Sequence, residues 1–173
     1  LTEALLSVFK QFPKLYAVFV GSDIGFLGLP MKEYMKQKLG GYMSRVIFFE
    51  NLRHEDLFPI VNSAMMVVLP SLWEAFGFVC VEAMALGRPV VASSGSGFAE
   101  IIEDGISGHL VEPGKSGLLA EKMINALNDK EGLTRISEGA RKRAQDFEVS
   151  KVALRLLSYY EKTRDEWLKQ RGN

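Results

Sequence analysis

Two glutamates, Glu74 and Glu82, flank a glycine at the point where an apolar run gives way to a helical pattern. The apolar run ends at Pro70-Ser71, and the helical pattern begins at Phe78. The first turn of a helix carries N–H groups without intrahelical partners and the positive end of the helix dipole, which both suit a phosphate. Gly77 has no Cβ to hold a ligand away from the backbone. Since open α/β sheets bind ligands at strand-to-helix junctions, the arrangement indicates a site for a nucleotide or sugar nucleotide.

The positions of the two carboxylates in the loop and in the helix predict that they contact different parts of a ligand. Helical side chains lean toward the N-terminus, so Glu82, about one turn into the helix, tilts back toward the bound anion. A carboxylate in that place can accept two hydrogen bonds from a ribose diol, whereas Glu74 in the loop can accept from a second sugar. The alternative is that Glu82 only meets the helix dipole or solvent and Glu74 is an ordinary loop acid. The neighbouring Phe76-Gly77 pair and the Pro-Ser strand end favour the ligand site.

The sequence also predicts the effect of a substitution at Gly77. A side chain there would occupy the phosphate site or need an unfavourable φ, so Gly77→Val is expected to abolish donor binding. If the role is functional, the ligand-free melting temperature stays nearly unchanged. If Gly77 is only a turn residue, its replacement lowers stability and leaves the ligand-induced shift intact.

Composition and charge limit the function classes. The 173 residues contain 21 Lys plus Arg and 21 Asp plus Glu, so no global field attracts nucleic acid or an anionic membrane. No apolar run approaches the roughly 20 residues that span a bilayer. The single cysteine, Cys80, cannot form an internal disulfide, which fits a reducing compartment, and a cytoplasmic location is expected.

Short apolar runs alternate with helical patterns along the chain. Continuously apolar runs are typical of parallel strands that are covered on both faces. Strand–helix alternation predicts an α/β fold with a Rossmann-like, doubly wound parallel sheet. The expected strands are 15–20, 45–49, 65–69, 89–93 and 109–111; the expected helices are 3–11, 31–39, 54–64, 78–85 and 117–127, followed by two amphipathic helices within 133–168, broken near 146–150.

Other residues that could take part in binding or catalysis give weaker indications of a functional role. Trp73 could stack on a sugar or base, but packing beside the strand end is the favoured interpretation. Cys80 lies among apolar neighbours with no histidine nearby in sequence, which favours a core thiol over a nucleophile. His54 and His109 are too isolated in the sequence for metal spacing or a catalytic triad.

The segment from Pro70 to Ala92 reads Pro-Ser-x-x-Glu-x-Phe-Gly-x-x-x-x-Glu-Ala-Met-Ala-x-Gly-x-Pro-Val-Val-Ala. It resembles the signature of retaining GT-B glycosyltransferases, the large glycosyltransferase family 4 (glycosyl transferases group 1). The likeness continues through 100–114, and 46–49 with 57–70 resembles the preceding strand, helix and strand. It covers essentially the whole chain and is densest over 45–114.

The resemblance implies that 1–173 is the C-terminal, donor-binding domain of a two-domain enzyme, one half of a GT-B fold with C-terminal helices. Such a domain begins with a strand, so we expect the opening strand to lie before Leu1, in an excised or trimmed chain. The partners implied are a nucleotide-sugar donor and the N-terminal acceptor domain of the same enzyme. That missing domain also allows peripheral membrane association.

The family's residue roles carry over to matching positions of this chain. By resemblance, Glu74 is the catalytic position and contacts donor-sugar hydroxyls, while Glu82 binds the ribose. Backbone amides hold the sugar and diphosphate, and the segment after the second strand meets the base. The remaining donor-binding residues implied are Phe76, Gly77, Phe78 and Val79 for the amides and Asn51 and Leu52 for the base.

The chain departs from the family pattern at three places. Glu50 stands where the family usually has glycine, Ser96-Gly97 stands for its Gly-Gly pair, and Ala99 replaces a frequent proline. The family's Arg and Lys that clamp the diphosphate lie on the opening strand and loop, which this chain does not contain.

The function implied is donor binding in a retaining glycosyltransferase, which transfers a sugar from a nucleotide diphosphate to a glycan, lipid or small molecule. No metal or other cofactor is expected, because helix N–H groups and the Arg/Lys pair offset the leaving group's charge. The domain alone is expected to be inactive. Two alternatives remain: a non-catalytic sugar-nucleotide-binding module, and a glycoside hydrolase that uses both glutamates. The hydrolase is less favoured because one acid lies at a helix start that suits phosphate.

Overall fold

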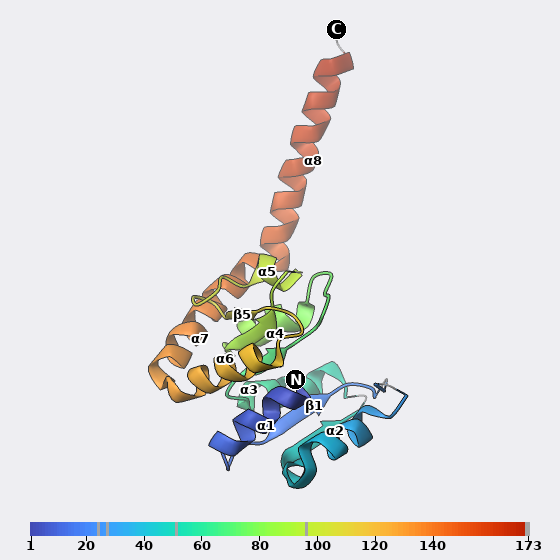
Figure 1. The fold of residues 1–173 in the computed structure, drawn as a ribbon. Helices are drawn as coiled ribbons and strands as arrows, with labels where there is room; N and C mark the ends of the chain where they lie inside the picture. Colours follow the sequence, from blue (N-terminus) through green and yellow to red (C-terminus); the bar gives the residue numbers. More distant parts are fainter. Residues whose placement is uncertain (24, 27, 51, 96, 172–173) are drawn as a thin grey trace.

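The computed structural model describes residues 1–23, 25–26, 28–50, 52–95 and 97–171 (Figure 1). The five expected strands and the first five expected helices are all present, with bounds that differ by two residues at most. The strands are β1 (Ala17–Val20), β2 (Val46–Phe49), β3 (Val67–Leu69), β4 (Val90–Ser93) and β5 (His109–Val111). The helices are α1 (Thr2–Gln11), α2 (Met31–Leu39), α3 (His54–Ser63), α4 (Phe78–Ala85), α5 (Gly97–Ile101), α6 (Ser116–Asn128), α7 (Lys130–Ala144) and α8 (Val149–Arg171), with 3₁₀ turns η1 (Gly40–Arg45) and η2 (Gln145–Phe147).

The strands are parallel, which confirms the predicted α/β class, but they are divided between two sheets. One sheet pairs β1 with β2, and the other has the order β3-β4-β5. Helix α1 packs against α2 beside the first sheet and against α6 beside the second. The two sheets therefore share one apolar core, in which Phe19 of β1 and Val91 of β4 both take part.

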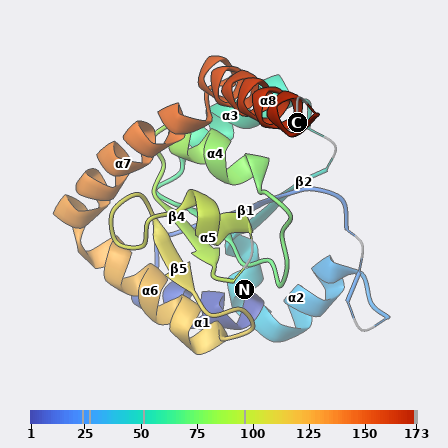
Figure 2. The same cartoon turned by 90° about the horizontal axis from the view of Figure 1, so that it is seen from above.

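Strand β4 is covered on both faces, as its continuous apolar run predicted. Its residues are fully buried, and successive side chains join different cores. Val91 packs with α1 and α6, whereas Val90 and Ala92 pack with α4, α5 and α7. Figure 2 shows α1 and α6 on one side of β4 and α4 on the other. Helices on both faces of this sheet hold the ends of its strands in place.

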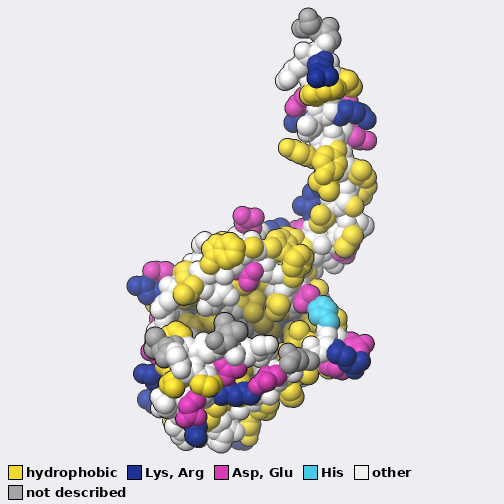
Figure 3. Space-filling view, turned by 90° about the vertical axis from the view of Figure 1, so that its right-hand side faces the viewer, with side chains coloured by type: hydrophobic (Ala, Val, Ile, Leu, Met, Phe, Trp, Pro, Cys, Tyr) yellow, Lys and Arg dark blue, Asp and Glu magenta, His cyan; other side chains and the backbone are white. Residues whose placement is uncertain are grey.

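The first sheet is covered on one face only, so the prediction of burial on both faces is wrong for β1 and β2. Ala17 and Phe19 contact the core, but Val18, Val20 and their neighbours on β2 are 38–44% exposed. Helix α3, which follows β2, has no buried residue and leaves this face open. Figure 3 shows one side of the globular part hollowed across its middle, with hydrophobic side chains in the hollow.

The C-terminal region confirms the two expected helices and the break between them. Helix α7 ends in the 3₁₀ turn η2, after which α8 projects away from the globular part (Figure 1). Residues of α8 are exposed along its length, and hydrophobic side chains gather on one side of it (Figure 3). Within the described residues no helix is both long and apolar enough to cross a membrane.

Candidate functional site

The loop between β3 and α4 lies at the carboxyl end of its sheet and touches the start of α5, the helix that follows β4. The N–H of Gly97 donates to the carbonyl oxygen of Glu74 at 2.9 Å. A Cβ on Gly97 would lie 2.6 Å from the carbonyl oxygen of Ala75, which is too close for any other residue. Gly97 therefore lets the loop and the start of α5 meet, and the pair builds the edge on which open α/β sheets bind ligands.

Gly77 is the residue before α4 and has a left-handed backbone, with φ +93°. A Cβ at this position would lie 2.4 Å from Cε1 of Phe98, whose side chain is 2% exposed. The protein itself therefore requires glycine here, before any ligand is bound. The expectation of an unchanged ligand-free melting temperature for Gly77→Val is revised accordingly, because that variant meets a buried ring.

The first turn of α4 faces solvent at this edge. The side chains of Phe78 and Val79 are 73% and 46% exposed, and the N–H of Cys80 already donates to Gly77. The amides of the two residues between have no partner within the helix, since first-turn N–H groups precede the hydrogen-bonding ladder. They can donate to oxygens of a bound anion, helped by the helix dipole.

Aromatic contacts support the loop from beneath. The ring of Phe76 lies 5.0 Å from that of Phe78 and 5.9 Å from that of Phe147 in η2. The guanidinium of Arg143 lies over the Phe147 ring at 5.0 Å. The start of α4 is thus held by residues about 70 positions later, which no local sequence pattern could indicate.

The two predicted acids have different surroundings. Glu74 is half-buried, and in the described part of the chain its carboxylate makes no hydrogen bond or ion pair. Glu82 is 30% exposed, and its Oε1 lies 3.0 Å from Nε2 of His54, whose side chain is exposed. His54 begins α3, and its ring lies 4.7 Å from that of Phe58. The prediction that His54 takes part in no metal cluster agrees with the described residues, but the fold brings this histidine beside the predicted ribose-binding acid.

The segment predicted to meet the base follows β2. Leu52 is half-buried and lies just before α3, while Asn51 lies outside the described residues. Glu50 pairs with the Lys32 ammonium at 2.5 Å, which ties this segment to α2. The residue that departs from the family glycine therefore has a structural partner.

Basic side chains near this edge are paired with acids. Lys32 pairs with Glu50, and Arg53 contacts Asp56 at 2.9 Å. Among the described residues, no three His, Cys, Asp or Glu side chains gather as metal ligands would. The absence of a metal and the origin of a diphosphate-clamping Arg and Lys both stay predictions.

The structure also shows the surroundings of Cys80 and Trp73. Cys80 is fully buried, and burial raises the pKa of its thiol to about 12, which confirms a core thiol. Trp73 is 75% exposed, so the favoured packing interpretation is wrong. Its indole lies in the loop beside Glu74, where it is open to solvent or a ligand.

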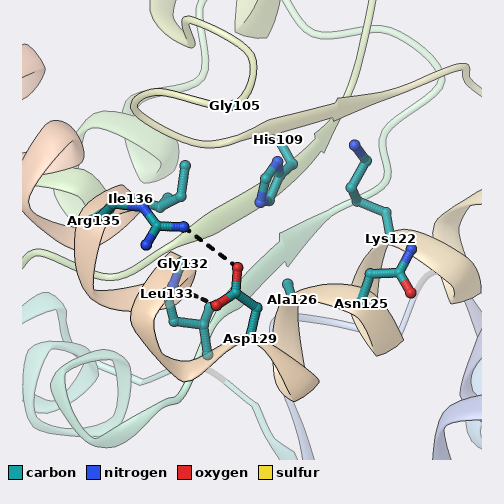
Figure 4. A pocket seen from close by; sticks show the side chains of 10 residues that line it. All are labelled: Gly105, His109, Lys122, Asn125, Ala126, Asp129, Gly132, Leu133, Arg135 and Ile136. Carbon is teal, nitrogen blue, oxygen red and sulfur yellow. Dashed lines mark hydrogen bonds and ion pairs between the residues drawn. The ribbon is translucent and has the colours of Figure 1, made fainter.

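A hollow of about 230 Å³ lies between β5, α6 and α7 (Figure 4). Its lining includes His109, whose ring points into it, and Arg135, which pairs with Asp129 at 3.5 Å. Nδ1 of His109 is buried without a hydrogen-bond partner among the described residues, and burial, helped by Lys122, lowers the pKa of this imidazole. His109 begins β5 and so marks the amino end of the sheet. The hollow is therefore separate from the loop at the carboxyl end.

This arrangement of elements and loops matches known proteins. The family model described as "Glycosyl transferases group 1" matches residues 1–143. The chain belongs to this family. It is 38% identical to D-inositol 3-phosphate glycosyltransferase 1 of Catenulispora acidiphila over 148 residues, which are 85% of this chain and 35% of that protein.

Solved structures of this family share the fold. Anabaena HepE in complex with UDP has a TM-score of 0.78 and 30% identity, covering 92% of this chain and 44% of that one. Sucrose-phosphate synthase from Thermosynechococcus elongatus has a TM-score of 0.78 and 28% identity, covering 95% of this chain and 42% of that one. The chain thus has the fold of a GT-B glycosyltransferase domain and spans less than half the length of these relatives.

Proposed function

We propose that this chain is the donor-binding half of a retaining glycosyltransferase, which moves a sugar from a nucleotide diphosphate to a glycan, lipid or small-molecule acceptor. The observation that carries the proposal is the edge where Gly77 and the exposed first turn of α4 lie between two carboxylates, Glu74 and Glu82. The similarity of the chain to HepE, a protein crystallised with UDP and with UDP-glucose, supports a nucleotide-sugar ligand.

Each group of the edge has one role in this proposal. The amides of Gly77, Phe78 and Val79 donate to diphosphate oxygens, helped by the α4 dipole. Glu82 accepts from the ribose diol, and Glu74 accepts from hydroxyls of the donor sugar. As the bond from the sugar to the diphosphate breaks, its electron pair leaves with the diphosphate, so the amides stabilise developing negative charge. The protein contributes positioning and electrostatics.

We further propose that the rest of the domain lies before Leu1. The β1–β2 and β3–β4–β5 sheets lie under a common helix, α1, yet share no hydrogen bonds among the described residues. A parallel strand that precedes α1 would enter between β1 and β3 by a right-handed crossover and join the sheets. That segment and an acceptor domain would supply the diphosphate clamp, so the 173 residues alone should bind nucleotide weakly and transfer no sugar.

Calorimetric titration with a panel of UDP-, GDP- and ADP-sugars and the bare nucleotides tests the proposal. Glu82→Gln keeps the side-chain shape but loses a charge-assisted acceptor, which should cost about 1.5–3 kcal/mol of nucleotide affinity. Glu74→Gln should spare the bare nucleotide and weaken only the sugar-dependent part. Equal loss of bare-nucleotide binding in both variants would contradict the division of roles, and no binding to any nucleotide would refute the proposal.

A further inference from the structure

His54 and Glu82 join two helices that otherwise have little contact. His54 is the first residue of α3, and Glu82 lies in the second turn of α4. Their side chains meet where Nε2 of His54 lies 3.0 Å from Oε1 of Glu82. Because α3 has no buried residue, packing alone does not fix the start of this helix.

The contact also orders the carboxylate. Glu82 is only partly exposed, and a carboxylate has two oxygens with about four lone-pair directions. His54 lies against Oε1, and no hydrogen bond or ion pair to Oε2 is made by the described residues, so this oxygen can accept from a ligand. The Phe58 ring, 4.7 Å from the imidazole, restricts the histidine in turn.

We propose that His54 is a positioning residue for nucleotide recognition, which holds the Glu82 carboxylate in the orientation that accepts the ribose hydroxyls. Because His54 lies two residues after Leu52, the same contact brings the predicted base-binding segment beside the predicted ribose-binding acid. The inference rests on the proposed function and assigns a role that acts through Glu82. The ligand class it concerns is a nucleotide with an intact ribose diol.

The test compares UDP with its 2′,3′-dideoxyribose analogue by titration calorimetry. His54→Phe keeps a ring against Phe58 but removes the ring nitrogen that lies beside Oε1, and it should weaken UDP binding about three- to tenfold, the loss of a modest polar contact. The same variant should bind the dideoxy analogue as the unchanged protein does. His54→Gln, which restores an N–H donor, should recover most of the UDP affinity. Arg53→Gln is the matched control, since it removes a neighbouring exposed charge and should leave the ratio of the two affinities unchanged.

A combined variant separates an effect through Glu82 from a direct one. In the Glu82→Gln background, His54→Phe should cause no more than about half of its single-variant loss, because partners in one network are not additive. Equal loss for UDP and for the dideoxy analogue would overturn the inference and indicate a direct contact or a folding effect. Unchanged UDP affinity in His54→Phe would overturn it as well.

A ligand-free measurement keeps this test distinct from that of the proposed function. The chain contains two histidines, so imidazole nitrogen NMR signals can be followed for His54 with His109 as internal reference. Glu82→Gln should move the His54 Nε2 signal and leave His109 in place; an unmoved His54 signal overturns the contact itself. If the unchanged protein binds no nucleotide, the proposed function fails and the inference fails with it. If it binds UDP without the predicted coupling, only the inference fails.

Discussion

Replacing Gly77 with alanine should destabilise the folded protein more than an ordinary loop substitution does. The new Cβ meets two separate obstacles. The backbone has φ +93°, which costs an L-residue about 1–2 kcal/mol. The Cβ would also lie 2.4 Å from Cε1 and 2.7 Å from Cδ1 of Phe98, a buried ring. Forcing an added methyl into a packed core costs about 1–3 kcal/mol.

The two costs together give about 2–5 kcal/mol, a large share of the total stability of about 5–15 kcal/mol that a domain usually has. Gly114→Ala is the matched control, because Gly114 has φ +78° and no described atom within 4 Å of its added Cβ. That variant should lose about 1–2 kcal/mol, from the backbone alone. The difference between the variants isolates the collision with Phe98.

Urea unfolding followed by circular dichroism measures both losses. A second variant tests the cause: Phe98→Leu should relieve the collision, so the Gly77→Ala/Phe98→Leu protein should lose less than the sum of the single losses. The reasoning is refuted if Gly77→Ala and Gly114→Ala lose the same stability, or if the Phe98 substitution adds in full.

Three further predictions concern the core and the opposite edge of the sheet. Cys80 should react with a thiol reagent only as fast as the protein unfolds, since burial raises its pKa to about 12; rapid labelling of the folded protein would contradict this. Burial lowers the pKa of His109 below 6.5, so the unfolded state binds the proton at higher pH. Stability should therefore be full above 6.5 and decline as the pH falls below it, and His109→Gln should reduce that decline in urea midpoints; an identical decline would exclude this imidazole as its source. Arg45 donates to the carbonyls of Phe9 and Phe12, each at 2.9 Å, so Arg45→Met should cost about 1.5–3 kcal/mol in thermal or urea unfolding, and a loss below about 0.5 kcal/mol would show that this contact is dispensable.

Local sequence rules predicted most of the helices and strands, but they did not predict correctly which faces of those strands are buried. The buried strand β4 followed from apolar continuity, and the helix α4 from the helical pattern that begins after Gly77. Strands β1 and β2 have the same continuous apolar character, yet one face is open because α3 does not cover it. The hydrophobic pattern of a sequence indicates that a strand is apolar, but it does not indicate whether a helix packs on each face of that strand.

The candidate site was predictable where its residues are adjacent and not where they meet through space. Glu74, Gly77 and Glu82 follow from spacing within one segment. The partner of Glu82, His54, is separated from it by the whole of β3, so spacing could not connect them. The same limit applies to Phe98, which explains the glycine requirement at position 77 by a contact between the β3–α4 loop and α5.

Binding of a nucleotide-sugar donor at the β3–α4 edge can be followed by backbone amide NMR, residue by residue. On addition of UDP-glucose, the largest shifts should fall on Gly77, Phe78 and Val79, since their N–H groups would donate to the diphosphate. The hollow around His109 lies at the other end of the sheet and should stay unchanged, which makes it the internal control. Shifts concentrated at that hollow, or no shift at the start of α4 at a saturating concentration of the donor, would contradict the account.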